Sequence, residues 1–377
     1  MKEHEQILEL WSETEKAGEE TVLATVVKTQ GSSYRLNGAR LLLTRSGQRA
    51  GSVSGGCLED DLVKKAWWLT EAGPVVRRYD TTPEGEITRE YGLGCSGIIH
   101  VLLERLAPGR ARLLELLREV RSSRTPAAVV HLLQPSSEVG KRLILDTQGL
   151  VEHNLTDPAL EGWLLQTAKE LLAGSQGRAH FFQGDHEIFA ETIMPPLRLL
   201  IFGAGDDAIP LTQLARHLGW QVHVYDGRAH YARAERFPSA HHVGVLKGDE
   251  SAEMETDRWT AAVLMSHSYS QDLARLRDLS GRALPYVGVL GPQKRTRLLL
   301  EDAGLDGNRL RSALRSPMGL DIGADGPEQV ALAVAAEIQA VVNGRDGGAL
   351  YQRHGSIHAN ETDRDHQMMF VRPIVCA

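Results

Sequence analysis

The chain has 377 residues, 42% of them hydrophobic and 24% charged, which is the composition of an ordinary globular protein with room for two or three domains. Its 42 basic and 49 acidic residues give a net charge of −7, which argues against a surface for nucleic acid or for an anionic membrane. No apolar run approaches the ~18 residues that span a bilayer, the opening segment lacks the apolar core of a signal peptide, and the 3 cysteines do not make a disulfide framework. We therefore expect a cytoplasmic protein with free thiols.

The first half of the chain is rich in strand signals. An amphipathic helix is predicted over 1–20, followed by runs of β-branched and aliphatic residues that turn residues separate. Strands are predicted at 21–29, 39–44, 75–80, 98–104, 127–133 and 142–146, helices at 57–72, 110–121 and 158–173, and a closing hairpin at 178–194. The two prolines of "MPPLR" (194–198) fit neither a helix nor a strand interior, so they mark a domain boundary. We expect a mixed α/β domain over 1–194 and detect no internal repeat in the sequence.

In the second half, apolar strand-like runs alternate with helical patterns. Strands are predicted at 197–202, 221–226, 241–246, 261–267 and 285–291, and helices at 207–218, 269–280 and 327–343. This alternation is typical of βαβ units on a parallel sheet. It predicts an α/β fold with a Rossmann-like domain over 195–345, and a polar tail over 346–377 that is an arm or disordered.

A glycine turn in this second half has the pattern of a nucleotide site. Gly203 and Gly205 follow a buried strand and open a helix, and Asp226 ends the next strand, where a carboxylate would hold ribose hydroxyls. Asp206 and Asp207 put two negative charges in the turn that would face a phosphate. The pattern therefore predicts a Rossmann fold and leaves open whether its ligand is NAD(P) or another molecule.

Two further segments follow predicted strands. Lys294 and Arg295 lie in the first turn of a helix after Gly291, which suits either an anion site or a solvated basic turn. His267 and Asp272 lie just past another strand end, where open α/β sheets hold ligands, and a helix-capping and loop role is the alternative.

Two cysteines stand among glycines. Cys57 follows Gly55 and Gly56 at the start of a predicted helix, and Cys95 lies in "GLGCSG". A helix N-terminus lowers the pKa of a thiol, but the acids that follow, Glu59 among them, oppose this effect. The two cysteines are either small buried residues of tight loops or thiols that glycines leave open to one ligand.

Six motifs together resemble, in order and spacing, the xanthine dehydrogenase accessory proteins of the XdhC/CoxI family. They are "QGSSYRLNGARLLLT", "GSVSGGCLE", "GCSG", "IFGAGDDA", "YVGVLG" and "PMGLDIGADGPEQVALAVAAEI". The resemblance implies an N-terminal α/β domain, a C-terminal Rossmann domain and a protein that binds molybdenum cofactor (molybdopterin). It also implies that the cofactor is sulfurated by a partner cysteine desulfurase and handed to a molybdenum hydroxylase of the xanthine dehydrogenase type.

The resemblance also implies which residues handle the cofactor. These are Ser54, Gly55, Gly56, Cys57 and Glu59 in the first loop, Gly94 and Cys95 in the second, and Gly203, Gly205, Asp226, His267, Lys294 and Arg295 in the Rossmann domain. The soft sulfur atoms of Cys57 and Cys95 would lie near the molybdenum. A homodimer would fit a protein that shields a labile ligand.

The sequence departs from the family pattern at three places. Asp206 stands where many members have a histidine, "SHSYSQD" replaces a "THDH" cluster, and Tyr34 replaces a common proline. Two alternatives to a cofactor chaperone therefore stay open: an NAD(P)-dependent oxidoreductase that uses the Rossmann domain, and a binding or regulatory protein without turnover.

Overall fold

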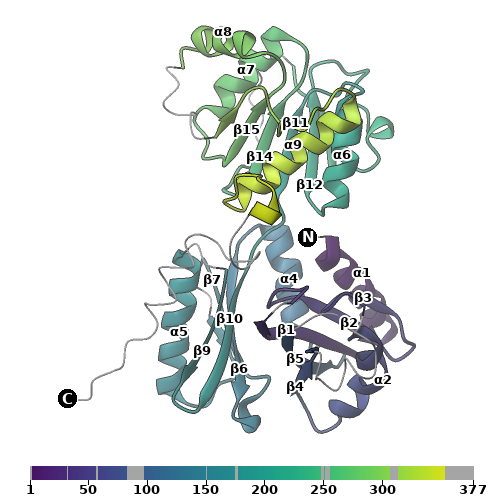
Figure 1. Cartoon of the computed structure of the whole chain (residues 1–377), viewed down its shortest axis with the longest axis vertical. Helices are drawn as coiled ribbons and strands as arrows, with labels where there is room; N and C mark the ends of the chain where they lie inside the picture. The colour runs from purple at the N-terminus through teal and green to yellow at the C-terminus, as the bar shows by residue number, and fades with distance from the viewer. Residues whose placement is uncertain are drawn as a thin grey trace, which may run out of the picture. The chain divides into compact units, whose positions relative to one another are not determined.

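The computed structural model describes residues 2–31, 33–56, 58–82, 97–149, 151–174, 177–247, 250, 255–305 and 313–352. The chain divides into two compact units, one spanning Glu3–Pro195 and one beginning at Pro196 (Figure 1). The first is a mixed α/β unit and the second contains a parallel sheet, so the predicted fold class is confirmed. Within the described ranges no helix is long and apolar enough to cross a membrane. Most of the predicted tail, 353–377, lies outside the described residues.

The first unit contains two antiparallel five-stranded sheets and four α-helices among its described residues. The first half comprises α1 (Lys2–Ala17), β1 (Thr21–Gly31), β2 (Arg40–Thr44), β3 (Arg49–Gly51), α2 (Glu59–Leu69), β4 (Val75–Asp80) and β5 (Gly97–Leu106). The second half comprises α4 (Arg112–Ser123), β6 (Ala127–Gln134), the 3₁₀ turn η1 (Ser136–Glu138), β7 (Arg142–Asp146), β8 (Val151–His153), α5 (Pro158–Ala173), β9 (Arg178–Gln183) and β10 (His186–Ile193).

These two halves repeat one topology. The strand order is β3-β2-β1-β5-β4 in the first sheet and β8-β7-β6-β10-β9 in the second, so the five strands of each half are arranged in the same way. The registers agree as well: Thr25 of β1 faces Arg40 of β2, and His131 of β6 faces Arg142 of β7. The sequence shows no repeat because the side chains at equivalent positions differ, as threonine and histidine do at this pair.

The repeat extends to an irregularity at the centre of the unit. β1 skips Val27 in its pairing with β5, and β6 skips Leu133 in its pairing with β10. These two bulged residues form a small core together with Leu102 and Phe189, which are also equivalent in the two halves. The halves therefore face each other about an approximate twofold axis.

Reciprocal ion pairs join the two halves. Arg40 of β2 pairs with Glu191 of β10, and Arg142 of β7 pairs with Glu104 of β5. The side chains of Arg40 and Glu191 are only 2% and 4% exposed, so both charges have left water and depend on each other. Burial alone raises the pKa of Glu191, but Arg40, with smaller contributions from His131 and Arg178, outweighs it and holds that pKa at about 2.

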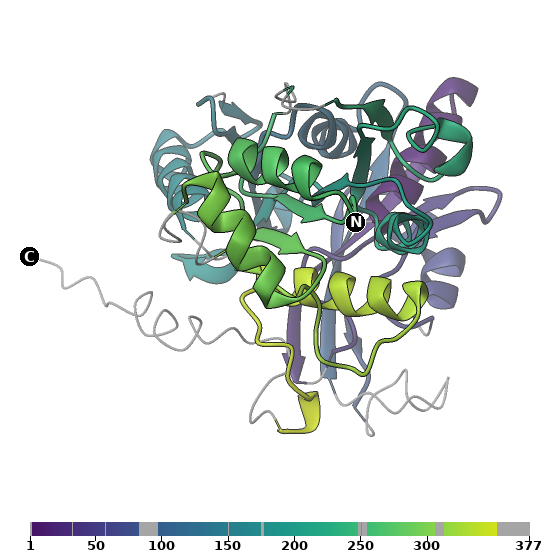
Figure 2. The same ribbon diagram turned by 90° about the horizontal axis from the view of Figure 1, so that it is seen from above.

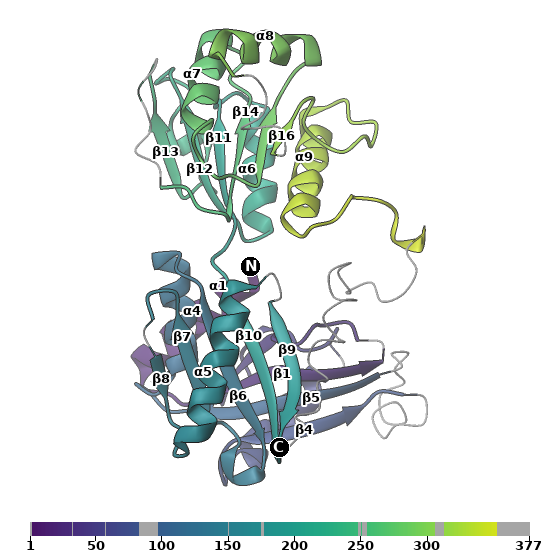
Figure 3. The same ribbon diagram turned by 90° about the vertical axis from the view of Figure 1, so that its left-hand side faces the viewer.

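Helices complete the layers of this unit. α2 packs its Leu62 on the outer face of the first sheet (Figure 1), and α5 packs its Leu164 on the outer face of the second (Figure 3). α1 and α4 share one core between the sheets, to which they contribute Trp11 and Leu117.

The second unit is a six-stranded parallel sheet with helices on both faces. Its elements are β11 (Arg198–Phe202), α6 (Ala208–His217), β12 (Gln221–Asp226), η2 (Ala234–Arg236), β13 (His242–Val245), β14 (Thr260–Leu264), α7 (Tyr269–Leu279), β15 (Tyr286–Val289), α8 (Gln293–Ala303), β16 (Leu314–Arg315), α9 (Pro327–Val342) and η3 (Leu350–Gln352). The strand order β13-β12-β11-β14-β15-β16 changes direction between β11 and β14. α6 and α9 cover one face of the sheet and α7 and α8 the other, as Figure 2 shows from above.

The predicted helices and longer strands of both units are present, with ends that differ by a few residues. Three short strands, β3, β8 and β16, were not predicted, and each has only 2 or 3 residues. Such short strands carry no periodic pattern and form because a longer neighbour offers them a pairing edge.

Candidate functional site

One end of the first sheet gathers the motifs of the N-terminal unit. Because β1 is antiparallel to β2 and β5, and β3 and β4 continue the alternation, Gly31, Arg40, Gly51, Asp80 and Gly97 all lie at this end. We call it the motif end. The connections that start or finish there carry "QGSSYRLNG", "SVSGGCLE" and "GCSG".

The loop before α2 is folded around the carboxylate of Glu59. This side chain is buried and accepts five hydrogen bonds, from the amides of Val53 (3.0 Å), Ser54 (2.9 Å) and Gly56 (3.0 Å) and from the hydroxyls of Ser52 (2.8 Å) and Ser54. Burial alone raises the pKa of Glu59, but these hydrogen bonds hold it below its ordinary value. Both Glu59 oxygens thus bind groups of its own loop, so the carboxylate determines the shape of that loop. Its predicted contact with a cofactor stays a prediction.

Glu3 of α1 ties this loop to the neighbouring one. Its carboxylate accepts a hydrogen bond from the Ser52 amide at 2.7 Å and pairs with Arg35 in the β1–β2 connection. The Tyr34 ring lies beside the glycine loop, since a Cβ built on Gly55 would be 3.8 Å from it. Glu3, Tyr34 and Arg35 were not predicted as site residues, because only the folded chain brings them to the loop.

Glycines leave this loop open to solvent. Gly55 and Gly56 are exposed, and Gly56 adopts φ +117°, a conformation that side-chain-bearing residues rarely take. Of the predicted site residues, Cys57, Gly94 and Cys95 lie outside the described residues. Their proximity to a ligand therefore stays a prediction.

The second unit has its own candidate site, at the carboxyl end of its parallel sheet. Ligands of open α/β sheets bind where the strand order changes direction, which here lies between the residues that follow β11 and β14. Gly203 follows β11 with φ +125°, and a Cβ on it would lie 2.3 Å from the Met265 carbonyl oxygen. Only glycine allows these two backbone segments to approach so closely.

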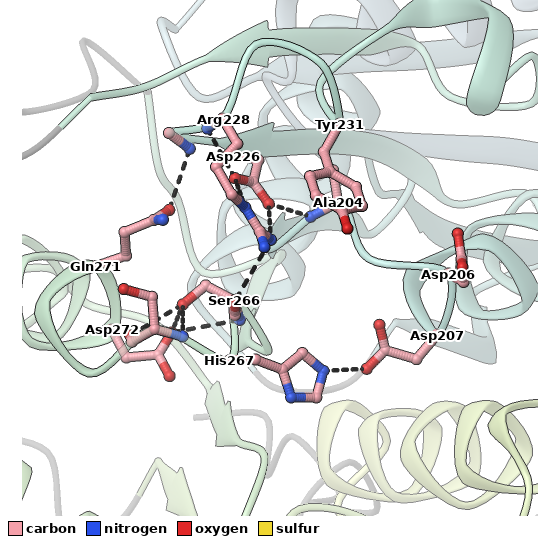
Figure 4. A network of polar contacts seen from close by, with 12 residues as sticks. Ala204, Asp206, Asp207, Asp226, Arg228, Tyr231, Ser266, His267, Gln271 and Asp272 are labelled. Atoms are coloured by element: carbon pink, nitrogen blue, oxygen red, sulfur yellow. Dashed lines mark hydrogen bonds and ion pairs between the residues drawn. The ribbon is translucent and has the colours of Figure 1, made fainter.

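The carboxylate of Asp226 is fully engaged within the chain. It accepts hydrogen bonds from the Ala204 amide (2.8 Å) and from the backbone N (2.8 Å), Nε (2.9 Å) and Nη2 (2.8 Å) of Arg228 (Figure 4). The Asp226 side chain is 0% exposed. Burial alone raises the pKa of Asp226, but Arg228 and Ala204 hold it below its ordinary value. To bind ribose hydroxyls, as predicted from its spacing, Asp226 would first have to release Arg228.

The two acids of the glycine turn are paired as well. The Asp207 carboxylate accepts a hydrogen bond from His267 Nε2 at 2.7 Å, and Asp206 pairs with Arg236 at 2.5 Å. Gly205 makes the first pair possible, because a Cβ there would lie 2.5 Å from Asp207 Oδ1. Arg236 thus offsets the charge of Asp206, and His267 occupies one oxygen of Asp207.

Asp272 and Arg295 also meet at this edge. Asp272 accepts hydrogen bonds from Ser266 Oγ (2.6 Å) and Arg295 Nη2 (2.7 Å), while Lys294 is exposed. The helix-capping part of the role predicted for His267 and Asp272 is wrong, because Ser268 is the N-cap of α7 and no side chain caps it. The loop part is present at Asp272, which accepts from Ser266. Both side chains instead reach other segments of the carboxyl edge.

Gly203→Ala is expected to lower the free energy of unfolding by roughly 2 kcal/mol, because the new methyl group meets the Met265 carbonyl and φ is positive. Urea denaturation of the full chain measures this. Gly304→Ala is the matched control: Gly304 also has a positive φ, +69°, but its Cβ would meet nothing within 4 Å. Equal losses in the two variants would show that the close approach at Gly203 contributes nothing.

Known proteins resemble both units. The model of the "XdhC Rossmann domain" matches residues 199–338, and that of the "XdhC and CoxI family" matches residues 15–80. A protein of Bacillus subtilis, described as a probable subunit of xanthine dehydrogenase, is 34% identical over 323 residues, which cover 85% of this chain and 92% of that protein.

Two more distant relatives extend the comparison. The molybdenum cofactor insertion chaperone PaoD of Escherichia coli is 26% identical over 343 residues, 90% of this chain and 89% of that protein. A solved structure described as a xanthine dehydrogenase from Bacillus halodurans is 26% identical and superimposes with a TM-score of 0.73, covering 91% of this chain and 98% of that one. The chain belongs to the XdhC and CoxI family, whose members are xanthine dehydrogenase accessory proteins.

Proposed function

We propose that this protein is a maturation factor that binds molybdenum cofactor as cargo and delivers it to a molybdenum hydroxylase of the xanthine dehydrogenase type. The observation that carries this proposal is the motif end, where a glycine loop held by Glu59 leaves backbone open beside Cys57. The named function of PaoD supports the same role.

The described residues fit such a cargo. A large planar ligand needs a surface free of side chains, which Gly55 and Gly56 offer, and a ring to lie against, which Tyr34 offers beside them. The thiol of Cys57, next in sequence, would supply the soft sulfur that suits molybdenum. In this proposal the thiol of Cys95 lies near the same metal.

For the Rossmann unit taken by itself, we propose a nucleotide or phosphate group as the ligand. Gly203, Gly205, His267, Lys294 and Arg295 are the residues we propose for this role. An NAD(P)-dependent oxidoreductase is a weaker alternative, because Arg228 occupies the carboxylate of Asp226 that would hold the ribose.

The proposed role also includes the location, the partners and the domain organisation of the protein. We propose a cytoplasmic protein that works as a homodimer, with a cysteine desulfurase and the client hydroxylase as partners. The domains would be 1–194 and 195–345, followed by an arm over 346–377.

The test is the pterin and molybdenum content of the protein purified from cells that make the cofactor. We expect bound pterin in the wild type and the loss of most of it in Cys57→Ala, because the sulfur contact to the metal is gone. Cys376→Ala, which changes a cysteine outside the motifs, serves as the control. Unchanged pterin in Cys57→Ala would refute the role of this thiol, and NAD(H) in place of pterin would favour the oxidoreductase.

A further inference from the structure

The motif end has a second wall, the edge strand β9 of the other sheet. We propose that Arg178, His180 and Phe182 of β9 belong to the same ligand site as the glycine loop and recognise the pterin ring of the cargo and an anionic group attached to it. This inference rests on the proposed function and adds three residues that the family motifs do not include.

The contacts of β10 place β9 at the motif end. Lys28, near the end of β1, donates to Glu187 of β10 at 2.7 Å, and Arg40, at the start of β2, pairs with Glu191. β10 therefore crosses the last residues of β1 and the first of β2. β9 pairs with β10 and is the last strand of its sheet, with Phe182 opposite Glu187 and Arg178 opposite Glu191.

Direct contacts confirm this placement. A Cβ built on Gly38, in the β1–β2 connection, would lie 3.1 Å from Arg178 Nε. Lys28 Nζ is 5.5 Å from the centroid of the Phe182 ring. Since Arg178, His180 and Phe182 are alternate residues of one strand, they share one face of β9.

The side chains on this face suit a planar anion. The Phe182 ring is 60% exposed, although it contacts the Lys28 ammonium, so it offers a surface for stacking. Arg178 forms no direct ion pair with any residue that the structure describes, which leaves its guanidinium available for a phosphate or carboxylate.

The histidines of this region are neutral near pH 7. Burial, together with the charge of Lys28, lowers the pKa of His100 on β5, and it also lowers the pKa of His180, where Glu187 opposes it in part. His180 Nε2 donates to the Glu187 carboxylate at 2.8 Å, so Nδ1 of the neutral ring is left to accept a hydrogen bond from an N–H group on the edge of a pterin ring.

The experiment measures binding in two ways on the full-length protein. One is pterin per chain after purification from cells that make molybdenum cofactor. The other is titration of the cofactor-free protein with pterin-6-carboxylate, a fluorescent planar anion. We expect Phe182→Ala and Arg178→Gln each to weaken binding of the probe about tenfold, and Phe182→Tyr, which keeps the ring, to bind like the wild type.

Matched controls change the same residue types elsewhere. Trp68→Ala removes an aromatic side chain of α2 that is 70% exposed, and Arg110→Gln removes an exposed arginine. Both should bind the probe normally. Normal binding by Phe182→Ala and Arg178→Gln would overturn the inference, as would a loss of hydroxylase docking in these variants without a loss of pterin.

The outcome for the wild type separates the two proposals. If the wild type retains pterin and the β9 variants retain as much, only the role of β9 fails. A wild type that retains no cofactor but binds the probe through Phe182 would support the β9 site and refute the cargo. A wild type that does neither would refute both.

Discussion

Glu191→Gln is expected to lower the free energy of unfolding of the N-terminal unit by about 4 kcal/mol, because it breaks a buried ion pair. The substitution leaves the guanidinium of Arg40 buried, with a side chain only 2% exposed, and without a countercharge. Urea denaturation followed by circular dichroism measures the loss.

A matched control uses an exposed pair of the same kind. Arg45 and Glu20 lie 3.2 Å apart with side chains 61% and 38% exposed, so Glu20→Gln should change stability by less than about 0.5 kcal/mol. The double variant Arg40→Met with Glu191→Leu should recover much of the loss, because no charge is then buried alone. Equal effects of Glu191→Gln and Glu20→Gln would contradict the role given to the buried pair.

The Arg40–Glu191 pair also makes the stability of the fold depend on pH in the acid range. The pKa of Glu191 is held at about 2, below the value of an unfolded glutamate, so its carboxylate stabilises the fold above the unfolded pKa. This contribution is lost as pH falls from the unfolded pKa towards 2. Glu191→Gln should therefore lose less stability than the wild type over that acid range.

Glu59→Gln is expected to lower the free energy of unfolding by about 3 kcal/mol and to remove most of the bound pterin. The glutamine has nearly the same shape, but its amide group would point N–H bonds at donors that now face a carboxylate, such as the Gly56 amide and the Ser54 hydroxyl. The glycine loop would lose the group around which it folds. Pterin content and denaturation of the purified variant measure the two effects.

Asp60→Asn is the control for this change. Asp60 is adjacent in sequence, its side chain is 65% exposed, and its partner Arg49 is 3.2 Å away, so stability and pterin should stay near the wild-type values. If Glu59→Gln lost stability but kept all its pterin, the loop would be structural and the cargo would bind elsewhere.

Much of the fold could be predicted from the sequence, because amphipathic helices repeat their apolar residues every three to four positions and buried strands appear as short aliphatic runs. The site was predicted less completely. Glu59 was recognised as an acid at a helix start, but its burial depends on how the preceding loop turns back. The spacing of Asp226 indicated a ribose ligand, whereas the turn that follows places Arg228 on the carboxylate. The pairing of Asp207 with His267 joins residues 60 positions apart and has no local signal.

The repeated topology of the N-terminal unit bears on how many cargo sites one chain can have. A dimer of two identical halves, related by the same twofold axis, would have two equivalent motif ends and hence two cargo sites. In the single chain the loop after β3 reads "SVSGG", whereas the equivalent loop after β8 reads "NLTDP", in which Asp157 serves as the N-cap of α5. The two halves therefore differ at the equivalent loop, and only the first half presents exposed glycines there. Under the proposed function, each chain has one cargo site, to which the first half gives the glycine loop and the second half gives β9, so we expect one cofactor molecule per chain.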